Sequence, residues 1–523
     1  MFKNLVRLGL LSTVAVTAFT SCEDQEFTDV HVDAKRVDVQ QLSPELAKVR
    51  DYVPLYAVVA HRGSTFWAPE ETESAWRWAR EMGVDYLESD LQCTKDGIVL
   101  ANHDENLKRT SNIENVFSEY VPTTRVQFYE SLGFDHADAV AQYNRDLAAF
   151  RPFYTMSYYY AELLMLDAGQ WFNESSLEQA RPSFKGTQYI SSLQDQIAYA
   201  EGKKLKRDAD GNRVLTWRVK PEYRGMTLQA IYEAIKAKGE YNAKYMDFIE
   251  YDWENAYVAD DQDTGHRPGI YIEFKESWLN PGNMEQRVYD VLDECGWNIM
   301  TNPEPENAPF YKDGKVNVGN TNGKVILQTF SFDALVRASK IFNGKVPMCY
   351  LLWTGDYATD LRFPTPTGYA DFIKMAQDNK AHILGPSIAG APNNYPEMNE
   401  PWAAYMIRKS GMLNHPYSFD SYAQTAKQMG LYNYGVVTEF DDLLRVEVPA
   451  TAYTTFTGVN SHPIYMDGFF TNRSEMSLLY MVENGFRGNA KLPNPFHPGT
   501  YFDNSQAPTH VPDAVETLVR LGY

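Results

Sequence analysis

Two histidines in the sequence each follow a short apolar stretch and stand directly before a charged residue. The stretch LYAVVA leads into His61 and Arg62, and the stretch IVLAN leads into His103 and Asp104. Short stretches rich in valine, leucine and isoleucine predict buried strands. In parallel α/β folds, reactive side chains gather at the carboxyl ends of the strands, where the loops are free to vary. The two histidines therefore predict an active site at that edge of a sheet.

Two pairs of charged residues have the two-residue spacing that places side chains on one face of a strand. They are Glu88 and Asp90 in DYLESDLQ, and Glu273 and Lys275 in GIYIEFKES. Carboxylates aimed at one point repel unless a cation neutralises them, and oxygen-only ligands favour a hard ion such as Mg²⁺ or Ca²⁺. In the alternative interpretation, these acids only form salt bridges with Arg62 and Lys275, without a metal.

This combination of side chains favours the chemistry of a phosphate ester. A metal and cationic side chains hold the charged oxygens, and imidazoles move protons.

The order of these motifs along the chain resembles the glycerophosphodiester phosphodiesterase family. The resemblance begins with HRG and APEETESAWRWAREMGVDYLESDLQCTKDGIVLANHDENLKRT, and it continues through YIEFK. Later landmarks are LMLDAGQWF, ILQTFSF, YGVVTEF and MDGFFTNR, so the match runs from about Ala57 to Arg473 with long interruptions. The resemblance implies an α/β fold, a TIM (β/α)8 barrel of the phosphatidylinositol-phosphodiesterase-like type with large insertions.

The family resemblance also implies an activity, the hydrolysis of a small glycerophosphodiester to glycerol 3-phosphate and an alcohol. We expect one divalent cation, Ca²⁺ or Mg²⁺, and general acid-base catalysis by two histidines whose order the sequence leaves open. The attacking oxygen is water, or a neighbouring glycerol hydroxyl by way of a cyclic phosphate. The expected site residues are His61 and His103 for catalysis, Arg62 and Lys275 for the substrate phosphate, Glu88, Asp90 and Glu273 for the metal, and Glu70 in a supporting role.

The sequence departs from the family pattern at three places. Glu71 stands where the family usually has asparagine, Val437 stands at the place of a tryptophan, and Asn472 replaces a final aspartate. These changes leave the alcohol half of the substrate open. Two other functions stay in view: a lyase resembling phospholipase C or sphingomyelinase D, and a surface lipoprotein that binds its ligand without catalysis.

The elements that must position the site residues alternate between strands and helices, which predicts βα units and a parallel sheet. The predicted strands are 56–60, 86–90, 98–103, 270–274, 325–329, 346–352, 382–384, 434–438 and 468–471. Nine candidates compete for the eight places of a barrel. We expect the short segment 382–384 to be peripheral.

The amino-terminal segment has the features of an export signal. Lys3 and Arg7 precede the apolar run LGLLSTVAVTAF, which is too short to span a membrane. The residues before Cys22 resemble a bacterial lipobox, which predicts a signal peptide over 1–21 and lipidation of Cys22. An ordinary signal peptide is the alternative. Residues 22–50 are predicted to form an acidic tether, and the protein is expected in the bacterial cell envelope, in the periplasm or at the outer-membrane surface.

Composition argues against some partners. A formal net charge of -21 disfavours nucleic acid and anionic lipid surfaces. Without a second long apolar run, membrane contact is expected only through the lipid on Cys22. The other cysteines, Cys93, Cys295 and Cys349, have no metal-site spacing and predict small buried residues, although one pair could close as a disulfide.

Long stretches interrupt the family landmarks, and we interpret residues 51–523 as one barrel with insertions. The insertions are predicted at about 112–160, 203–266 and 386–417. The first two lie between the His103 strand and the Glu273 strand, where the family carries a smaller subdomain over the barrel mouth. Their position predicts an influence on substrate choice.

Overall fold

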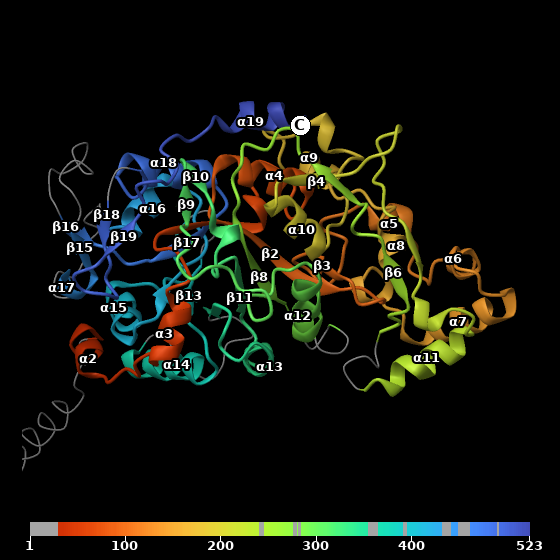
Figure 1. The fold of residues 1–523 in the computed structure, drawn as a ribbon, viewed down its shortest axis with the longest axis horizontal. Coiled ribbons are helices and arrows are strands. Elements are labelled where there is room, and N and C mark those ends of the chain that lie inside the picture. The colour runs from red at the N-terminus through yellow and green to blue at the C-terminus, as the bar shows by residue number, and fades with distance from the viewer. Residues whose placement is uncertain are drawn as a thin grey trace, which may run out of the picture.

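The computed structural model describes residues 30–239, 245–275, 280, 284–353, 365–390, 395–430, 441–447, 461–488 and 491–523. Figure 1 shows a central group of strands surrounded by helices, with α6, α7 and α11 at one end of the long axis and α2, α17, β15 and β16 at the other.

The central sheet is a nearly closed barrel, and this confirms the predicted fold. In the described part of the chain it contains eight parallel strands in the order β14-β13-β12-β11-β8-β2-β1-β17. The strands are β1 (Ala57–Ala60), β2 (Tyr86–Cys93), β8 (Gly269–Phe274), β11 (Val325–Thr329), β12 (Met348–Leu352), β13 (Ile383–Pro386), β14 (Leu413–Asn414) and β17 (Gly468–Thr471). The backbone N–H of Asp467 donates to the carbonyl of Asn414 at 2.8 Å, and Phe419 pairs in parallel with Thr471. These contacts join the two edges of the sheet.

The structure corrects the predicted assignment of strands. The segment 98–103 contains β3 (Val99–Ala101), which pairs antiparallel with β2 and takes no place in the barrel. The reason is the turn at Gly97, which has a φ of +78° and is too short for the crossover that parallel strands need. The segment 382–384, expected to be peripheral, belongs to the barrel strand β13. The prediction at 434–438 lies outside the described residues.

Helices cover the outside of the barrel, as the alternation of elements predicts. They are α4 (Glu73–Met82), α10 (Leu193–Ala200), α12 (Met284–Glu294), α13 (Phe332–Phe342), α14 (Pro366–Asp378), α15 (Pro401–Ser410), α16 (Tyr422–Gln428) and α18 (Ser474–Glu483). Helix α13 illustrates the local cause: the Ser331 side chain accepts a hydrogen bond from the N–H of Ala334 and caps the start. Leu335, Ala338 and Phe342 then fall at helical spacing and are buried against the barrel.

The predicted insertion 386–417 contributes to the barrel itself. It contains helix α15 and strand β14, which pairs with β13. A strand of two residues has too short an apolar pattern to be detected in the sequence.

The other two predicted insertions form one subdomain with a hydrophobic core of its own. Its elements are α5 (Ile113–Val116), α6 (Arg125–Ser131), α7 (His136–Ala149), α8 (Tyr160–Leu163), α11 (Leu228–Ala237), β5 (Trp217–Val219) and β6 (Ile249–Tyr251). The buried guanidinium of Arg125 bonds both carboxylate oxygens of Glu162 at 3.0 and 2.7 Å, which ties α6 to α8.

Shorter elements complete the described chain. They are α9 (Gln170–Ser175), α17 (Asp441–Leu444), α19 (Ala514–Leu521), and the pairs β4 (Lys203–Leu205) with β7 (Tyr257–Ala259), β9 (Tyr311–Lys312) with β10 (Lys315–Val316), β15 (Arg445–Glu447) with β16 (Ser461–Pro463), and β18 (Lys491–Pro493) with β19 (Tyr501–Asp503).

The last part of the predicted tether is folded. Residues from 30 to 50 form α2 (Val30–Arg36) and α3 (Pro44–Arg50), and the side chains of Ala34 and Val49 are buried. The N–H of Leu42 donates to the carbonyl of Ser410 at 2.8 Å, which fixes this segment beside α15. None of the helices in the described ranges is long and apolar enough to cross a bilayer.

Candidate active site

The predicted catalytic and metal-binding residues meet at the carboxyl ends of β1, β2 and β8. A cavity of about 820 Å³ opens there, and its lining includes His61, Arg62, Glu88, His103, Glu273 and Lys275. Asp90 lies buried among these side chains, and Glu70 borders them. Cys22 lies outside the described residues.

The HRG motif forms a single tight turn, η1 (His61–Gly63), directly after β1. Gly63 has a φ of +85°, and a Cβ at this position would lie 2.6 Å from the Cβ of Ala75. Only glycine fits both restrictions. The N–H of Arg62 donates to Glu88 at 2.7 Å, so the turn is held against the neighbouring strand.

The three predicted metal ligands are brought together by strand register. Asp90 on β2 pairs with Glu273 on β8, and Glu88 lies on the same face of β2. One oxygen atom from each of these carboxylates lies within 4.8 Å of the others, and all three residues are buried. Burial, together with the neighbouring Asp90, raises the pKa of Glu88 well above its usual range, and burial raises that of Glu273 to about 7.

Two cations contact the same carboxylates. Arg62 Nε lies 2.8 Å from Asp90 Oδ2, while Lys275 Nζ lies 2.8 Å from Glu273 and 3.2 Å from Asp90. Against the effect of burial, Lys275 and Arg62 hold the pKa of Asp90 below its usual range. The salt bridges of the alternative interpretation are therefore present.

These salt bridges do not saturate the acids. Three carboxylates face two cations, and neither oxygen of buried Asp90 accepts a hydrogen bond of normal geometry. Gln328 Nε2 donates to Glu88 Oε1 at 2.8 Å and orients that carboxylate. The donor set is all oxygen and carries an excess negative charge, so it fits a hard divalent cation.

The side chain of Asn472 fixes the ring of His61. The Nδ1 atom of His61 lies 2.6 Å from Asn472 Oδ1, while Asn472 Nδ2 donates to Asp420 at 2.7 Å. Because Asp420 fixes the orientation of the amide, Nδ1 of His61 must be the donor, and Nε2 carries a free lone pair. Burial and then Arg62 lower the pKa of His61 to about 3, so the imidazole is neutral at pH 7.

The Nδ1 atom of His103 contacts a carboxylate, whereas that of His61 contacts an amide. The Nδ1 atom of His103 lies 2.6 Å from Asp104 Oδ1, and Asp104 accepts a hydrogen bond from Arg109 Nε at 2.8 Å. Arg109 also binds both oxygens of Glu70 at 2.6 and 3.0 Å, which gives the predicted supporting residue a definite contact. Burial and then Lys275 lower the pKa of His103 to about 4.

Several of these functional contacts were not predicted. Asp104 follows His103 in the sequence and Asn472 occupies the place of the family aspartate, so the positions of both residues indicate a role beside the histidines. Gln328 and Asp420 come from other strands and loops, and their positions in the sequence give no such indication. Glu71, which departs from the family pattern, accepts a hydrogen bond from the N–H of Asp90 at 2.6 Å.

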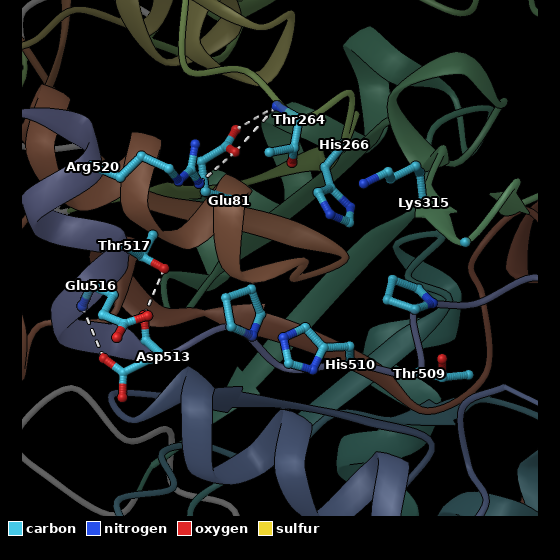
Figure 2. Close-up of a pocket in the computed structure, with 13 residues that line it drawn as sticks. Glu81, Thr264, His266, Lys315, Thr509, His510, Asp513, Glu516, Thr517 and Arg520 are labelled. Carbon is cyan, nitrogen blue, oxygen red and sulfur yellow. Dashed lines mark hydrogen bonds and ion pairs between the residues drawn. The ribbon is translucent and has the colours of Figure 1, made fainter.

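A second cavity, of about 490 Å³, lies near the opposite ends of the strands, beside the residues that precede β8. Figure 2 shows Glu81, His266, Lys315, His510 and Arg520 around it. Glu81 already accepts hydrogen bonds from Arg520 and from the N–H of Thr264. Among its described lining residues there is no group of acids and histidines able to hold a metal. The larger cavity is therefore the candidate active site.

Comparisons with known proteins point to one family. Residues 61–239 match the model of the glycerophosphoryl diester phosphodiesterase family. A glycerophosphodiester phosphodiesterase of Bacillus subtilis is 24% identical over 389 residues, which cover 74% of this chain and 84% of that protein. A glycerophosphoinositol inositolphosphodiesterase of Mus musculus is 32% identical over 132 residues, and the match spans 25% of this chain and only 19% of the mouse protein. The structure of a phosphodiesterase of Oleispira antarctica in complex with sn-glycerol-3-phosphate aligns with a TM-score of 0.40 and 14% identity, over 82% of this chain and 97% of that one.

Proposed function

The chain belongs to the glycerophosphoryl diester phosphodiesterase family and is an enzyme of that class, and from this premise we propose how its own residues hydrolyse a glycerophosphodiester. The products are glycerol 3-phosphate and an alcohol. The observation that carries the proposal is that two oriented histidines, three carboxylates, an arginine and a lysine share one cavity at the barrel mouth.

We propose that Glu88, Asp90 and Glu273 hold one divalent cation, Mg²⁺ or Ca²⁺. When bound, such an ion supplies positive charge that neutralises and polarises a phosphate oxygen. The oxygen-only ligands, and the excess of three carboxylates over the two cations that contact them, support this assignment.

Arg62 and Lys275 bind and orient the phosphodiester. Both cations line the cavity and are held by buried acids, Arg62 by Asp90 and Lys275 by Glu273 and Asp90. A phosphodiester carries one negative charge on its two non-bridging oxygens. Fixed cations beside it stabilise the additional charge that develops as phosphorus becomes five-coordinate.

The different partners of the two histidines support different roles for the two rings. His61 donates its Nδ1 proton to a neutral amide, so its free Nε2 lone pair is suited to accept the proton of the attacking hydroxyl or water. His103 faces the carboxylate of Asp104, which opposes the lowering of its pKa by burial and Lys275 and makes this ring better suited than that of His61 to donate a proton to the leaving oxygen. The leaving alcohol then lies on the His103 side of the cavity.

The test is release of glycerol 3-phosphate from glycerophosphocholine and glycerophosphoethanolamine by the chain that begins after Cys22. We expect turnover that EDTA abolishes and that one of Mg²⁺ and Ca²⁺ restores. His61→Ala and His103→Ala should each remove turnover and leave the circular dichroism spectrum unchanged. Absence of turnover on either substrate, and on an aryl phosphodiester, would favour the non-catalytic binding protein instead.

Phosphorus NMR of the products separates the two candidate nucleophiles. Attack by water gives glycerol 3-phosphate directly, whereas attack by the glycerol hydroxyl produces a cyclic phosphate signal first. A cyclic phosphate that accumulates as the final product would make the enzyme a lyase.

We also propose that the protein is exported and anchored through a lipid on Cys22. The apolar run and the small residues before Cys22 support this proposal. Metabolic labelling with a radioactive fatty acid should mark the wild-type protein and leave Cys22→Ser unlabelled. Equal labelling of both proteins would contradict it.

A further inference from the structure

A segment of the insertion subdomain lies beside the residues that follow His103. The N–H of Thr155 donates to the carbonyl of Glu105 at 3.0 Å, and the N–H of Leu107 donates to the carbonyl of Phe153 at 2.9 Å. Phe153 is only 5% exposed, which anchors the segment in the core of the subdomain. The insertion is therefore fixed to the loop that carries His103.

This arrangement brings insertion side chains into the active-site cavity. Arg151 and Tyr154 line it together with Glu105, and the Arg151 guanidinium lies 6.0 Å from the centre of the Tyr154 ring. The N–H of Arg151 donates to Ser157 Oγ at 2.9 Å, which fixes the backbone from which the side chain projects. An arginine over an aromatic ring is partly ordered before a ligand arrives.

Arg151 and Glu105 differ from the charged residues that surround the two histidines, whereas Asp333 at the start of α13 also lines the cavity without an ion pair among the described residues. Arg62 and Lys275 are held by carboxylates, and Asp104 is held by His103 and Arg109. Within the described residues, neither Arg151 nor Glu105 forms an ion pair, either with each other or with a third side chain, although both line the same cavity. Their charges are available to a ligand.

We propose that Arg151 and Glu105 form a subsite for the alcohol half of the substrate, and that they select an alcohol bearing both an anionic and a cationic group. Arg151 binds the anion, such as a carboxylate, and Glu105 binds an ammonium group. This inference rests on the proposed function, because the acid role of His103 places the leaving alcohol on this side.

Three glycerophosphodiesters whose alcohols carry different charged groups test the subsite. Glycerophosphoserine carries an ammonium and a carboxylate, glycerophosphoethanolamine carries the ammonium alone, and glycerophosphoglycerol carries neither. For the wild-type enzyme we expect kcat/KM to fall in that order, with about a tenfold preference for serine over ethanolamine, typical of one charge-assisted hydrogen bond.

Two variants assign the preference to its residues. Arg151→Gln should reduce the serine-to-ethanolamine ratio toward one, because its amide cannot pair with the carboxylate. Glu105→Gln should instead lower kcat/KM for glycerophosphoserine and for glycerophosphoethanolamine by the same factor, because both carry the ammonium group. The value of kcat/KM for glycerophosphoglycerol should stay unchanged. Arg151 is exposed and forms no ion pair within the described chain, so the variant is expected to fold.

A matched control lies in the same subdomain. The Arg145 guanidinium bonds Gln142 and Gln229 and does not line the cavity, so Arg145→Gln should keep the wild-type ratio. The proposed subsite would be overturned if the wild-type ratio of kcat/KM for glycerophosphoserine to that for glycerophosphoethanolamine were near one, or if Arg151→Gln left this ratio unchanged. In either case, turnover of these substrates would still support the proposed function. Absence of wild-type turnover on all three substrates would overturn both.

Discussion

The partner of His61 offers the sharpest test of the two histidine roles. In Asn472→Asp, a carboxylate replaces the amide oxygen that lies 2.6 Å from Nδ1. An opposite charge at such a distance typically raises a histidine pKa by about 1–3 units. Arg62, which already lowers the pKa of His61, opposes part of this effect, so we expect the pKa to rise from about 3 to about 4–5.

Asp420 must be changed together with Asn472. Asn472 Nδ2 now donates to Asp420 at 2.7 Å, so the single variant would place two carboxylates in contact and favour protonation of one of them. The double variant Asn472→Asp with Asp420→Asn reverses the direction of this hydrogen bond, so that one donor still faces one acceptor. It therefore delivers the negative charge to His61 without the repulsion.

The assay is the pH dependence of kcat/KM on a chromogenic glycerophosphodiester, with the divalent cation kept saturating at every pH because its affinity falls below pH 7. If His61 is the base, activity requires its neutral form, so it is lost as the pH falls through the pKa of the ring. The acid limb of the double variant should move upward by about 1–2 pH units relative to wild type. An acid limb that does not move would refute the assignment of His61 as the base.

Four further predictions concern the metal site, the HRG turn and the insertion. Because burial raises the pKa of Glu273 to about 7, protons compete with the cation, and calorimetry should show Mg²⁺ affinity falling about tenfold per pH unit below 7. Because the pKa of Glu273 is higher in the folded protein than the value of 4.5 expected in the unfolded chain, the metal-free protein loses stability as the pH rises from 4.5 toward 7. Added Mg²⁺ should reverse this loss in thermal denaturation. Gly63→Ala should lower the stability by about 1–3 kcal/mol, seen as a lower melting temperature, because the new Cβ would meet Ala75. It should also lower kcat, and an unaffected kcat would contradict the role of the turn. Arg125→Leu leaves Glu162 buried without its cation, whereas Asp146 keeps its ion pair with Lys95, and the variant should cost about 3–5 kcal/mol, seen as faster amide exchange in the insertion but not in the barrel.

The sequence predicted the barrel, and it predicted most of the residues that gather in the candidate site, because local patterns encode both. Glu88 and Asp90 lie two residues apart on one strand, and strand register alone then places Glu273 beside them. The turn at Gly63 is likewise a local requirement, since φ and the contact with Ala75 both exclude a side chain.

The rest could not be predicted because it depends on contacts between distant segments. The partner of His61 lies 411 residues away at Asn472, and Gln328 reaches Glu88 across 240 residues. Strand β14 has two residues and no detectable pattern. The error at β3 had a local remedy, since the Gly97 turn indicates a hairpin rather than a crossover.

The most direct test of the mechanism compares two leaving groups on the two histidine variants. An alkyl alcohol needs a proton as it leaves, whereas nitrophenolate does not, so the loss in His103→Ala should be smaller on glycerol 3-phospho-p-nitrophenol by about 100-fold or more. His61→Ala should lose activity equally on both substrates, because the attacking oxygen still requires its base. Equal losses in His103→Ala, or selective rescue of His61→Ala by the nitrophenyl substrate, would contradict the assigned acid and base.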